Sequence, residues 1–435
     1  MNKQATHRSL SQGVGLTGVV ALGLGTAVGV AIFSVIAPAS ALAGPGALVS
    51  VLLAALPMFV IAVTYAFMGS ALPASGASYE WPRRFIHPAV GFFIAWLRIA
   101  GSISALLVLA FVLTRYLRMA IEVPTRLTMF AVFAMVFASN YRGIAIAARL
   151  QTILMAALVA LFIVFAAWGT AHVQLVHFEP LLPNGLSGVL AALPLLVGLF
   201  FGIEAATEVG EEIKHARRVI PLGIGLSIAS ALTLYLLVTS IALGVAGAPA
   251  LAEAEAPLLS AAAIFMGPLA KPLIIAAAVI AIGKSLNALF LIFSRNLFAM
   301  ARAQALPAAL ARIHPRFGTP HRAVSVVFGV CTLGLLLPLN LVGLFLAVNV
   351  PTLLKYAATS IAATRVVKQH HDIYQAARFK LRPTAMLRWA WASAAAAVAV
   401  VLLGLQADWR PYAVLAGWAA IGMVYYAFQG RPTNG

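Results

Sequence analysis

Glycines interrupt the centres of two apolar stretches of the sequence. The first stretch contains Gly23, Gly25 and Gly29, and a much later one contains Gly198 and Gly202. Glycine weakens a helix interior by about 1 kcal/mol relative to alanine, although in membrane helices it also allows close packing. At matching positions, the two clusters indicate two broken helices. Freed N–H groups attract a carboxylate and freed carbonyls accept an ammonium, so the breaks suit a zwitterion.

Ionisable residues inside apolar stretches are the next candidates. Glu204 directly follows the second glycine cluster, and Lys284 lies in a later apolar block. Such a residue at membrane depth costs about 2.5–3.5 kcal/mol on insertion scales, so each deserves a functional hypothesis. For Glu204 the functional hypothesis is proton coupling, and the alternative is a structural hydrogen bond. Glu208 is expected to be solvated nearer the cytoplasm, and Arg98 and Lys355 to be structural residues nearer the inner face.

The remaining polar residues argue against enzymatic chemistry. All nine histidines lie at the ends of apolar stretches or between them, and only Glu204 and Glu208 among the eleven acidic residues lie inside one. This is too few for a carboxylate metal site or an aspartyl dyad. His370 and His371 precede an aspartate, but a solvated loop is the simpler interpretation. The single cysteine, Cys331, excludes an intrachain disulfide and cysteine-based metal clusters.

Composition shows which elements must position these residues. Of 435 residues, 63% are hydrophobic and 9% are charged, which leaves no polar coat for a water-soluble fold. Apolar blocks such as 46–72, 89–114 and 219–247 reach the ~20 residues of a transmembrane helix. Continuous runs rich in Leu, Ala and Gly do not fit the alternation of a β-barrel. Gly13–Ala43 is too long for a signal-peptide core and is expected to be the first span.

Cutting the sequence at Pro, Gly and charge clusters predicts an all-α polytopic membrane protein with one membrane domain. The predicted spans are 13–40, 46–72, 88–114, 126–141, 146–171, 187–210, 219–247, 269–302, 321–337, 340–366, 388–406 and 410–429. With a cytoplasmic N-terminus, most of the 29 Lys and Arg residues fall on the cytoplasmic side, which predicts that both termini are cytoplasmic. The net charge of +18 is thereby explained by topology, without nucleic acid as a partner.

Four segments resemble, in order, those of the amino acid, polyamine and organocation (APC) superfamily, whose permeases have a leucine-transporter-like fold. They are GLGTAVGVAIF with the following GPGA (Gly23–Phe33 and Gly44–Ala47), ALPASGASYEWPRRFIHPAVGFFIAW (Ala71–Trp96), FFGIEAATEVGEEIKHARRVIP (Phe200–Pro221) and SRNLFAMARAQALPAALARIHPRFGTPHRAV (Ser294–Val324). The similarity covers the first ten predicted helices.

The resemblance implies two inverted repeats, 13–171 with helices 1–5 and 187–366 with helices 6–10, followed by helices 11 and 12 in 388–429. It further implies that helices 1, 2, 6 and 7 rock against a scaffold, with substrate bound at the breaks in helices 1 and 6. The substrate-binding residues are expected to be Ala27, Val28, Gly29, Val30, Ala31, Gly198, Phe200, Phe201, Gly202 and Ile203. In that set, backbone at 29–31 would receive a carboxylate, and carbonyls near 27, 198 and 201 an amino group. Phe200 or Phe201 would be an aromatic lid, with ordinary packing as the alternative.

The sequence departs from the family pattern at the first break. Many relatives carry Gly-Ser-Gly or Gly-Thr-Gly where this chain has Gly29, Val30 and Ala31. The backbone donors remain, but alanine resists dihedral angles that glycine adopts. Weaker polar binding of the carboxylate and an apolar pocket would suit Leu, Ile, Val, Met or Phe as substrate. Weaker binding would also suit an exporter, which must release its substrate. The compact chain is also similar to bacterial neutral amino acid exporters of the superfamily.

The resemblance also suggests how transport is driven. Helix 8 faces the sodium site of the family, so the Lys284 ammonium would replace a bound cation; some relatives place such a lysine in helix 5, where this chain has Leu158. The alternative for Lys284 is a lysine paired with a carbonyl or a lipid phosphate. Glu204 lies where relatives often carry an acid linked to gating or proton sensing. We therefore expect a proton-linked or exchange carrier of neutral or apolar amino acids in the plasma or bacterial inner membrane, without a cofactor and with its oligomeric state open. The alternatives are a polyamine or organic amine transporter and a transport-inactive sensor or scaffold.

Overall fold

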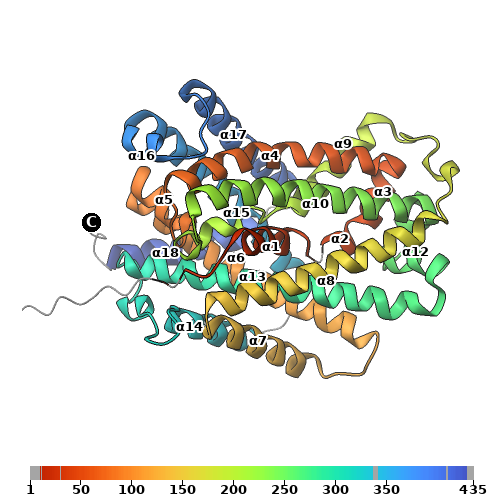
Figure 1. Cartoon of the computed structure of the whole chain (residues 1–435), viewed down its shortest axis with the longest axis horizontal. Helices are drawn as coiled ribbons and strands as arrows, with labels where there is room; N and C mark the ends of the chain where they lie inside the picture. The colour runs from red at the N-terminus through yellow and green to blue at the C-terminus, as the bar shows by residue number, and fades with distance from the viewer. Residues whose placement is uncertain (1–9, 11, 30, 337–340, 408–409, 429–435) are drawn as a thin grey trace, which may run out of the picture.

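The computed structural model describes residues 10, 12–29, 31–336, 341–407 and 410–428, and its regular elements are helices. Long helices run side by side along the longest axis of the molecule (Figure 1). Within the described residues, seven helical stretches are long and apolar enough to cross a membrane, and shorter apolar helices accompany them. The prediction of an all-α polytopic membrane protein is therefore confirmed, whereas the inverted repeat stays a prediction.

Each predicted span corresponds to helical structure. The long helices are α4 (Ala47–Ala71), α6 (Pro88–Arg118), α7 (Thr125–Tyr141), α8 (Ile144–Thr170), α10 (Ala216–Ala246), α13 (Ala270–Arg302), α14 (His321–Gly334), α15 (Leu341–Gln369), α17 (Pro383–Ala407) and α18 (Arg410–Phe428). Shorter helices lie near the ends of the bundle, among them α5 (Ala77–Phe85), α11 (Ala248–Glu253), α12 (Pro257–Met266) and α16 (His371–Ala376).

The first predicted span is broken in the middle. Its pieces are α1 (Leu16–Ala27), α2 (Ala31–Ser34) and α3 (Ile36–Ala43). The amide of Gly29 donates to the carbonyl of Ala27 at 2.8 Å, a local turn in place of the helical pattern. The break falls at Gly29, as the glycine cluster predicts.

The sixth predicted span is also broken, and more severely than expected. Helix α9 (Gly185–Val197) ends in a 3₁₀ turn over Gly198–Phe200, after which Phe201 is extended. We expected a span reaching residue 210, but the chain beyond the break forms only the 3₁₀ turns η4 (Ala205–Glu208) and η5 (Gly210–Glu212). The reason is pairing with neighbouring segments. Bridges join Val209 to Ser75 and Ile213 to Val14, so backbone groups form hydrogen bonds to these segments and not within a helix.

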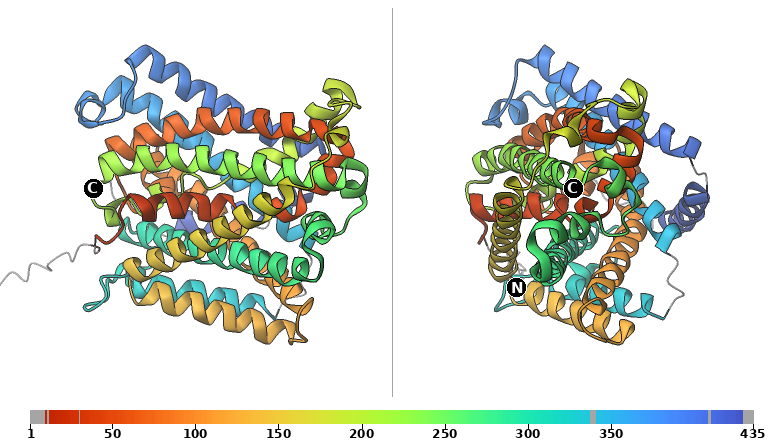
Figure 2. Two further views of the ribbon diagram at one scale, coloured as in Figure 1. Left: turned by 45° about the vertical axis from the view of Figure 1, so that its right-hand side comes forward. Right: turned by 90° about the vertical axis from the view of Figure 1, so that its right-hand side faces the viewer.

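The broken segments lie inside the bundle. Helix α1 packs against α10, α8 and α13, while α15 packs against α6 and α17 (Figures 1 and 2). Small residues allow the close approach of α1 and α10, because a Cβ atom on Gly23 would lie 2.3 Å from the Ser227 hydroxyl. Helix α1 also contacts the 3₁₀ turn η4, so the two breaks lie close together.

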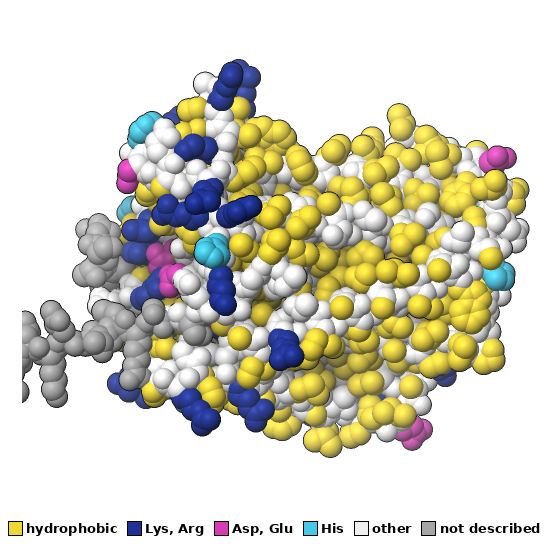
Figure 3. Space-filling model, viewed as in Figure 1, with side chains coloured by type: hydrophobic (Ala, Val, Ile, Leu, Met, Phe, Trp, Pro, Cys, Tyr) yellow, Lys and Arg dark blue, Asp and Glu magenta, His cyan; other side chains and the backbone are white. Residues whose placement is uncertain are grey.

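Charge is distributed unevenly over the surface. Lys and Arg side chains gather at the end of the molecule that carries α5 and α16, which we call the basic end (Figure 3). The flank shown between the two ends is mainly hydrophobic. A lipid-facing band with a basic rim on one side is the pattern expected of a membrane protein.

Candidate functional site

A cavity of about 250 Å³ lies where the two breaks meet. Backbone and side chains of both broken segments form part of its wall, and α6, α13 and α15 complete it. Among the described residues, its lining comprises Thr26, Ala27, Gly29, Ala31, Arg98, Ala105, Val108, Leu109, Gly198, Phe201, Gly202, Glu204, Ala205, Glu208, Ser285, Leu289, Ile292, Thr352 and Lys355. The cavity is smaller than typical drug-sized sites of ~300–1,000 Å³, so it suits a small molecule.

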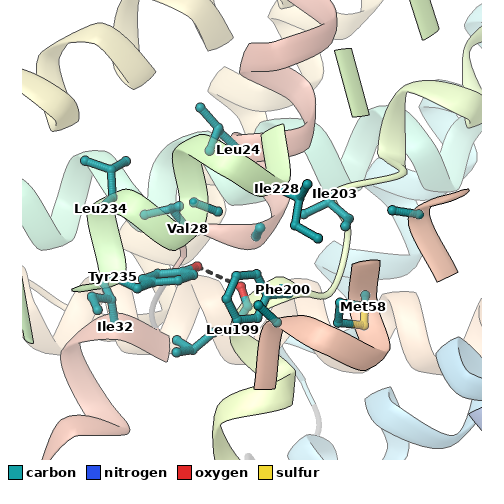
Figure 4. Close-up of a cluster of buried hydrophobic side chains, with 14 of the residues drawn as sticks. Leu24, Val28, Ile32, Met58, Leu199, Phe200, Ile203, Ile228, Leu234 and Tyr235 are labelled. Atoms are coloured by element: carbon teal, nitrogen blue, oxygen red, sulfur yellow. Dashed lines mark hydrogen bonds between the residues drawn. The ribbon is translucent and has the colours of Figure 1, made fainter. Parts of the chain in front are cut away.

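Six of the predicted binding residues line this cavity: Ala27, Gly29, Ala31, Gly198, Phe201 and Gly202. Three others are packed in the hydrophobic core (Figure 4): Val28, Phe200 and Ile203. Phe200 is fully buried, with its ring 5.4 Å from that of Tyr235. Of the two lid candidates, only Phe201 therefore faces the cavity. Val30 lies outside the described residues.

Hydrogen bonds join the two breaks to each other and to α15. The Thr26 hydroxyl lies 2.6 Å from the carbonyl of Gly202, and the Gly202 amide donates to the Tyr356 hydroxyl at 3.3 Å. Gly202 has φ +96°, and an added Cβ would lie 2.5 Å from Cβ of Thr26. Only glycine fits this conformation and this contact without strain. The unwound backbone of the second break is consequently fixed in place.

Lys284 reaches the end of α1. Its ammonium group is fully buried and contacts the carbonyls of Leu24, Gly25 and Val28, the first two at 3.4 and 3.2 Å. The last carbonyls of a helix lack intrahelical partners and carry the negative end of the helix dipole. The next residue, Ser285, donates to Gly25 at 2.7 Å. Lys284 of α13 thus supplies a positive charge to the carbonyls at the end of α1.

Glu204 forms an ion pair with Lys355 in the cavity wall. Lys355 of α15 contacts one carboxylate oxygen, and the Tyr356 hydroxyl donates to the other at 2.9 Å. The ammonium also lies 4.6 Å from the centre of the Tyr356 ring and 5.7 Å from that of Tyr65. Our expectation that Lys355 is only a structural residue nearer the inner face missed this pairing, because the two residues are 151 positions apart.

Glu208 is buried, and the expectation that it is solvated is wrong. Only 1% of its surface is exposed. Arg98 on α6 donates to its carboxylate at 2.8 Å, and the Ser78 hydroxyl contacts the same oxygen. The Ser78 amide lies 3.3 Å from the other oxygen. These donors replace the water that would otherwise solvate the acid, and Arg98 also lines the cavity.

Two further ion pairs follow the second break. Glu212 and Arg295 are both fully buried and share two hydrogen bonds, at 2.8 and 2.9 Å. Glu211 and Arg302 form a partly exposed pair at 2.7 Å. Residues 204–212, which we call the acidic segment, thus connect through ion pairs to α6, α13 and α15. The last two pairs were not predicted from the sequence, although it contains four glutamates within these nine residues.

This combination belongs to a particular class of protein. Membrane-length helices enclose a small cavity at two broken helices, and the described residues include no cluster of three or more His, Cys, Asp or Glu that could bind a metal ion. Such an arrangement is that of a membrane transporter. The chain matches the model of the amino acid permease family over residues 14–427 and belongs to this family. The expected APC superfamily membership is confirmed, and the protein is a transporter, not an enzyme.

Individual relatives support the same family. A methylthioribose transporter of Bacillus subtilis is 25% identical over 99% of this chain and 96% of its own length. A branched-chain amino acid permease of the same organism is 26% identical over 98% and 94%. An uncharacterized transporter of Mycobacterium tuberculosis is 33% identical over 73% of this chain and 72% of its own. The similarity therefore extends over nearly the whole membrane domain.

Proposed function

We propose that this permease is a secondary-active transporter of neutral, mainly apolar amino acids. The observation that carries the proposal is the cavity between the two breaks, because its wall combines unwound backbone with aliphatic side chains. Backbone around Gly29 and Ala31 would receive the substrate carboxylate, and carbonyls near Ala27, Gly198 and Phe201 the ammonium.

The opposite wall would receive the substrate side chain. Ala105, Val108 and Leu109 of α6 face the cavity together with Leu289 and Ile292 of α13. Aliphatic surface of this kind favours an apolar side chain, since each buried CH₂ contributes about 0.8 kcal/mol. The name of the branched-chain amino acid permease from Bacillus subtilis agrees with such a cargo.

Alternating access would require the acidic segment to move. We propose that α1, α4, the acidic segment and α10 rock against α6, α13 and α15, and that the basic end is cytoplasmic. Glu208 and Glu212 then join the moving part to Arg98 and Arg295 of the scaffold. Opening toward the cytoplasm would separate these buried pairs, so the described arrangement fits a state closed on that side.

Flux into liposomes tests the proposal. Purified protein is reconstituted in liposomes loaded with unlabelled leucine, and uptake of labelled leucine, methionine, phenylalanine, arginine, glutamate and putrescine is followed at imposed pH gradients. We expect uptake of the apolar amino acids. Uptake of putrescine alone would favour the organic amine alternative, and the absence of flux for every substrate would favour the transport-inactive sensor or scaffold.

Lys284 and Glu204 are tested for separate roles, replacement of a cation and coupling to protons. If Lys284 replaces a cation at the end of α1, Lys284→Ala should lower leucine transport by about tenfold or more, because three carbonyls lose their buried donor. Lys271→Ala is the matched control, since Lys271 is exposed on the same helix.

If Glu204 takes part in proton coupling, Glu204→Gln should flatten the pH dependence of uptake. Unchanged pH dependence would remove Glu204 from the coupling mechanism.

A further inference from the structure

We infer that the Glu204–Lys355 pair sets the charge selectivity of the cavity, so that substrates with a net charge on their side chain are excluded. The inference rests on the proposed function and adds the residues that determine its substrate class. The charged side chains of the cavity lining carry it.

The charged groups in the described lining balance one another. They are two acids, Glu204 and Glu208, and two bases, Arg98 and Lys355. Each acid contacts one of the bases: Glu204 pairs with Lys355, and Glu208 pairs with Arg98. All four residues are at most 8% exposed. The cavity is therefore rich in charge but presents no net charge to a substrate.

This balance favours neutral side chains. A charged side chain entering the cavity would leave water and find each opposite charge already paired. To gain a partner it would have to separate a buried pair and leave the other member uncompensated. A neutral side chain disturbs neither pair. Selectivity is a difference between affinities. Here it arises because a charged competitor finds no unpaired charge of the opposite sign in the cavity.

Lys355 and Glu204 are better placed to control selectivity than Arg98 and Glu208. Glu204 lies two residues after Gly202, at the break that would bind the substrate backbone. Glu208 is fixed further by two contacts from Ser78. Lys284 adds a third buried base nearby, but its ammonium contacts the carbonyls of α1. The net charge of the cavity should consequently change when one member of the Glu204–Lys355 pair is neutralised.

Two opposite substitutions test the inference. Lys355→Met leaves Glu204 without its base, so transport of arginine relative to leucine should rise by about tenfold. Glu204→Gln leaves Lys355 without its acid, so transport of glutamate relative to leucine should rise instead. Lys355→Gln removes the charge while keeping a hydrogen-bond donor for Glu204, and it replaces Lys355→Met if the latter does not fold. The double variant Glu204→Gln/Lys355→Met restores neutrality and should exclude both charged amino acids again.

Arg295→Met is the matched control, because it also leaves a buried glutamate without its base. Glu212 and Arg295 are absent from the described cavity lining, although both are fully buried. Its transport rate is expected to change, but its ratio of arginine to leucine transport should equal that of the wild type. If this variant also gained arginine transport, a general loosening of the fold would explain the data and the inference would be wrong.

The measurement is uptake of labelled arginine, glutamate and leucine into proteoliposomes, with arginine and glutamate uptake expressed relative to the leucine uptake of the same variant. Variants are compared after size-exclusion chromatography shows a single folded species and leucine uptake is detectable. Continued exclusion of arginine by both Lys355 variants, or arginine transport by the double variant, overturns the inference while leaving the proposed function intact. Absence of leucine uptake by the wild type would instead reject the proposed function itself.

Discussion

Gly202 determines the backbone conformation of the second break and its contacts with α1 and α15. Its positive φ and its contact with Thr26 combine two requirements that only a residue without a side chain satisfies. The same residue bonds through its carbonyl to α1 and through its amide to α15. A change at this position therefore acts on both breaks at once.

We expect Gly202→Ala to abolish most leucine transport. The added methyl group would collide with Thr26, and the strained dihedral angle alone costs about 1–3 kcal/mol. The check is leucine uptake together with thermal stability in detergent. Gly225→Ala is the control, because Gly225 is on α10 and a Cβ there would meet nothing within 4 Å. Normal uptake by Gly202→Ala would show that the break does not need this conformation.

At the residue scale, the sequence predicted the positions of the helix breaks better than the partners of the charged side chains. Glycine acts on its own helix, so the breaks at Gly29 and Gly202 could be located from local sequence alone. Lys355 and Arg98 were placed in apolar stretches but assigned only structural roles, because their acids come from segments more than 100 residues away. Local periodicity contains no information about such pairs.

At the scale of elements, the acidic segment differs most from expectation. The sequence predicted continuation of a membrane span to residue 210, and the structure shows 3₁₀ turns joined to neighbouring segments by backbone bridges. The partners in these bridges come from residues near the N-terminus and from the segment before α5. Hydropathy placed the region up to residue 210 in a membrane span, but it could not show that tertiary pairing replaces helical hydrogen bonds.

The ion pairs of the acidic segment should differ in their contribution to stability. Arg295→Met leaves Glu212 buried without its base, which is expected to lower the free energy of unfolding by about 3–5 kcal/mol. Arg302→Gln affects a pair whose side chains are 39% and 31% exposed, and a change of about 0–1 kcal/mol is expected. Unfolding in mixed micelles of rising denaturing-detergent content measures both. Equal losses would contradict the role assigned to burial.

At the scale of the whole molecule, charge asymmetry predicts orientation. The basic end carries α16, whereas α3 and α12 lie toward the other end (Figure 1). Hydropathy alone was sufficient to predict the class of fold, because continuous apolar runs of this length fit membrane helices and not the alternating strands of a β-barrel. The order in which helices pack could be proposed only through the family resemblance, since it depends on contacts between distant segments.

Labelling of introduced cysteines checks this orientation. The native Cys331 is fully buried, and Cys331→Ser gives a background without thiols. Leu175→Cys and Asp372→Cys place one thiol at an exposed position on each side of the predicted membrane. With both termini cytoplasmic, a membrane-impermeant maleimide added to intact cells should label only Leu175→Cys, and permeabilised cells should show both. The reverse pattern would invert the predicted topology.

The pairing of acids and bases around the cavity has a consequence for sequence variation. Loss of either Glu204 or Lys355 alone leaves an uncompensated buried charge, whereas loss of both leaves none. The two positions are therefore expected to covary among homologues, changing together between charged and neutral residues. Arg98 and Glu208 should follow the same rule. Homologues that keep only one member of the Glu204–Lys355 pair are the ones in which a charged cargo is to be sought.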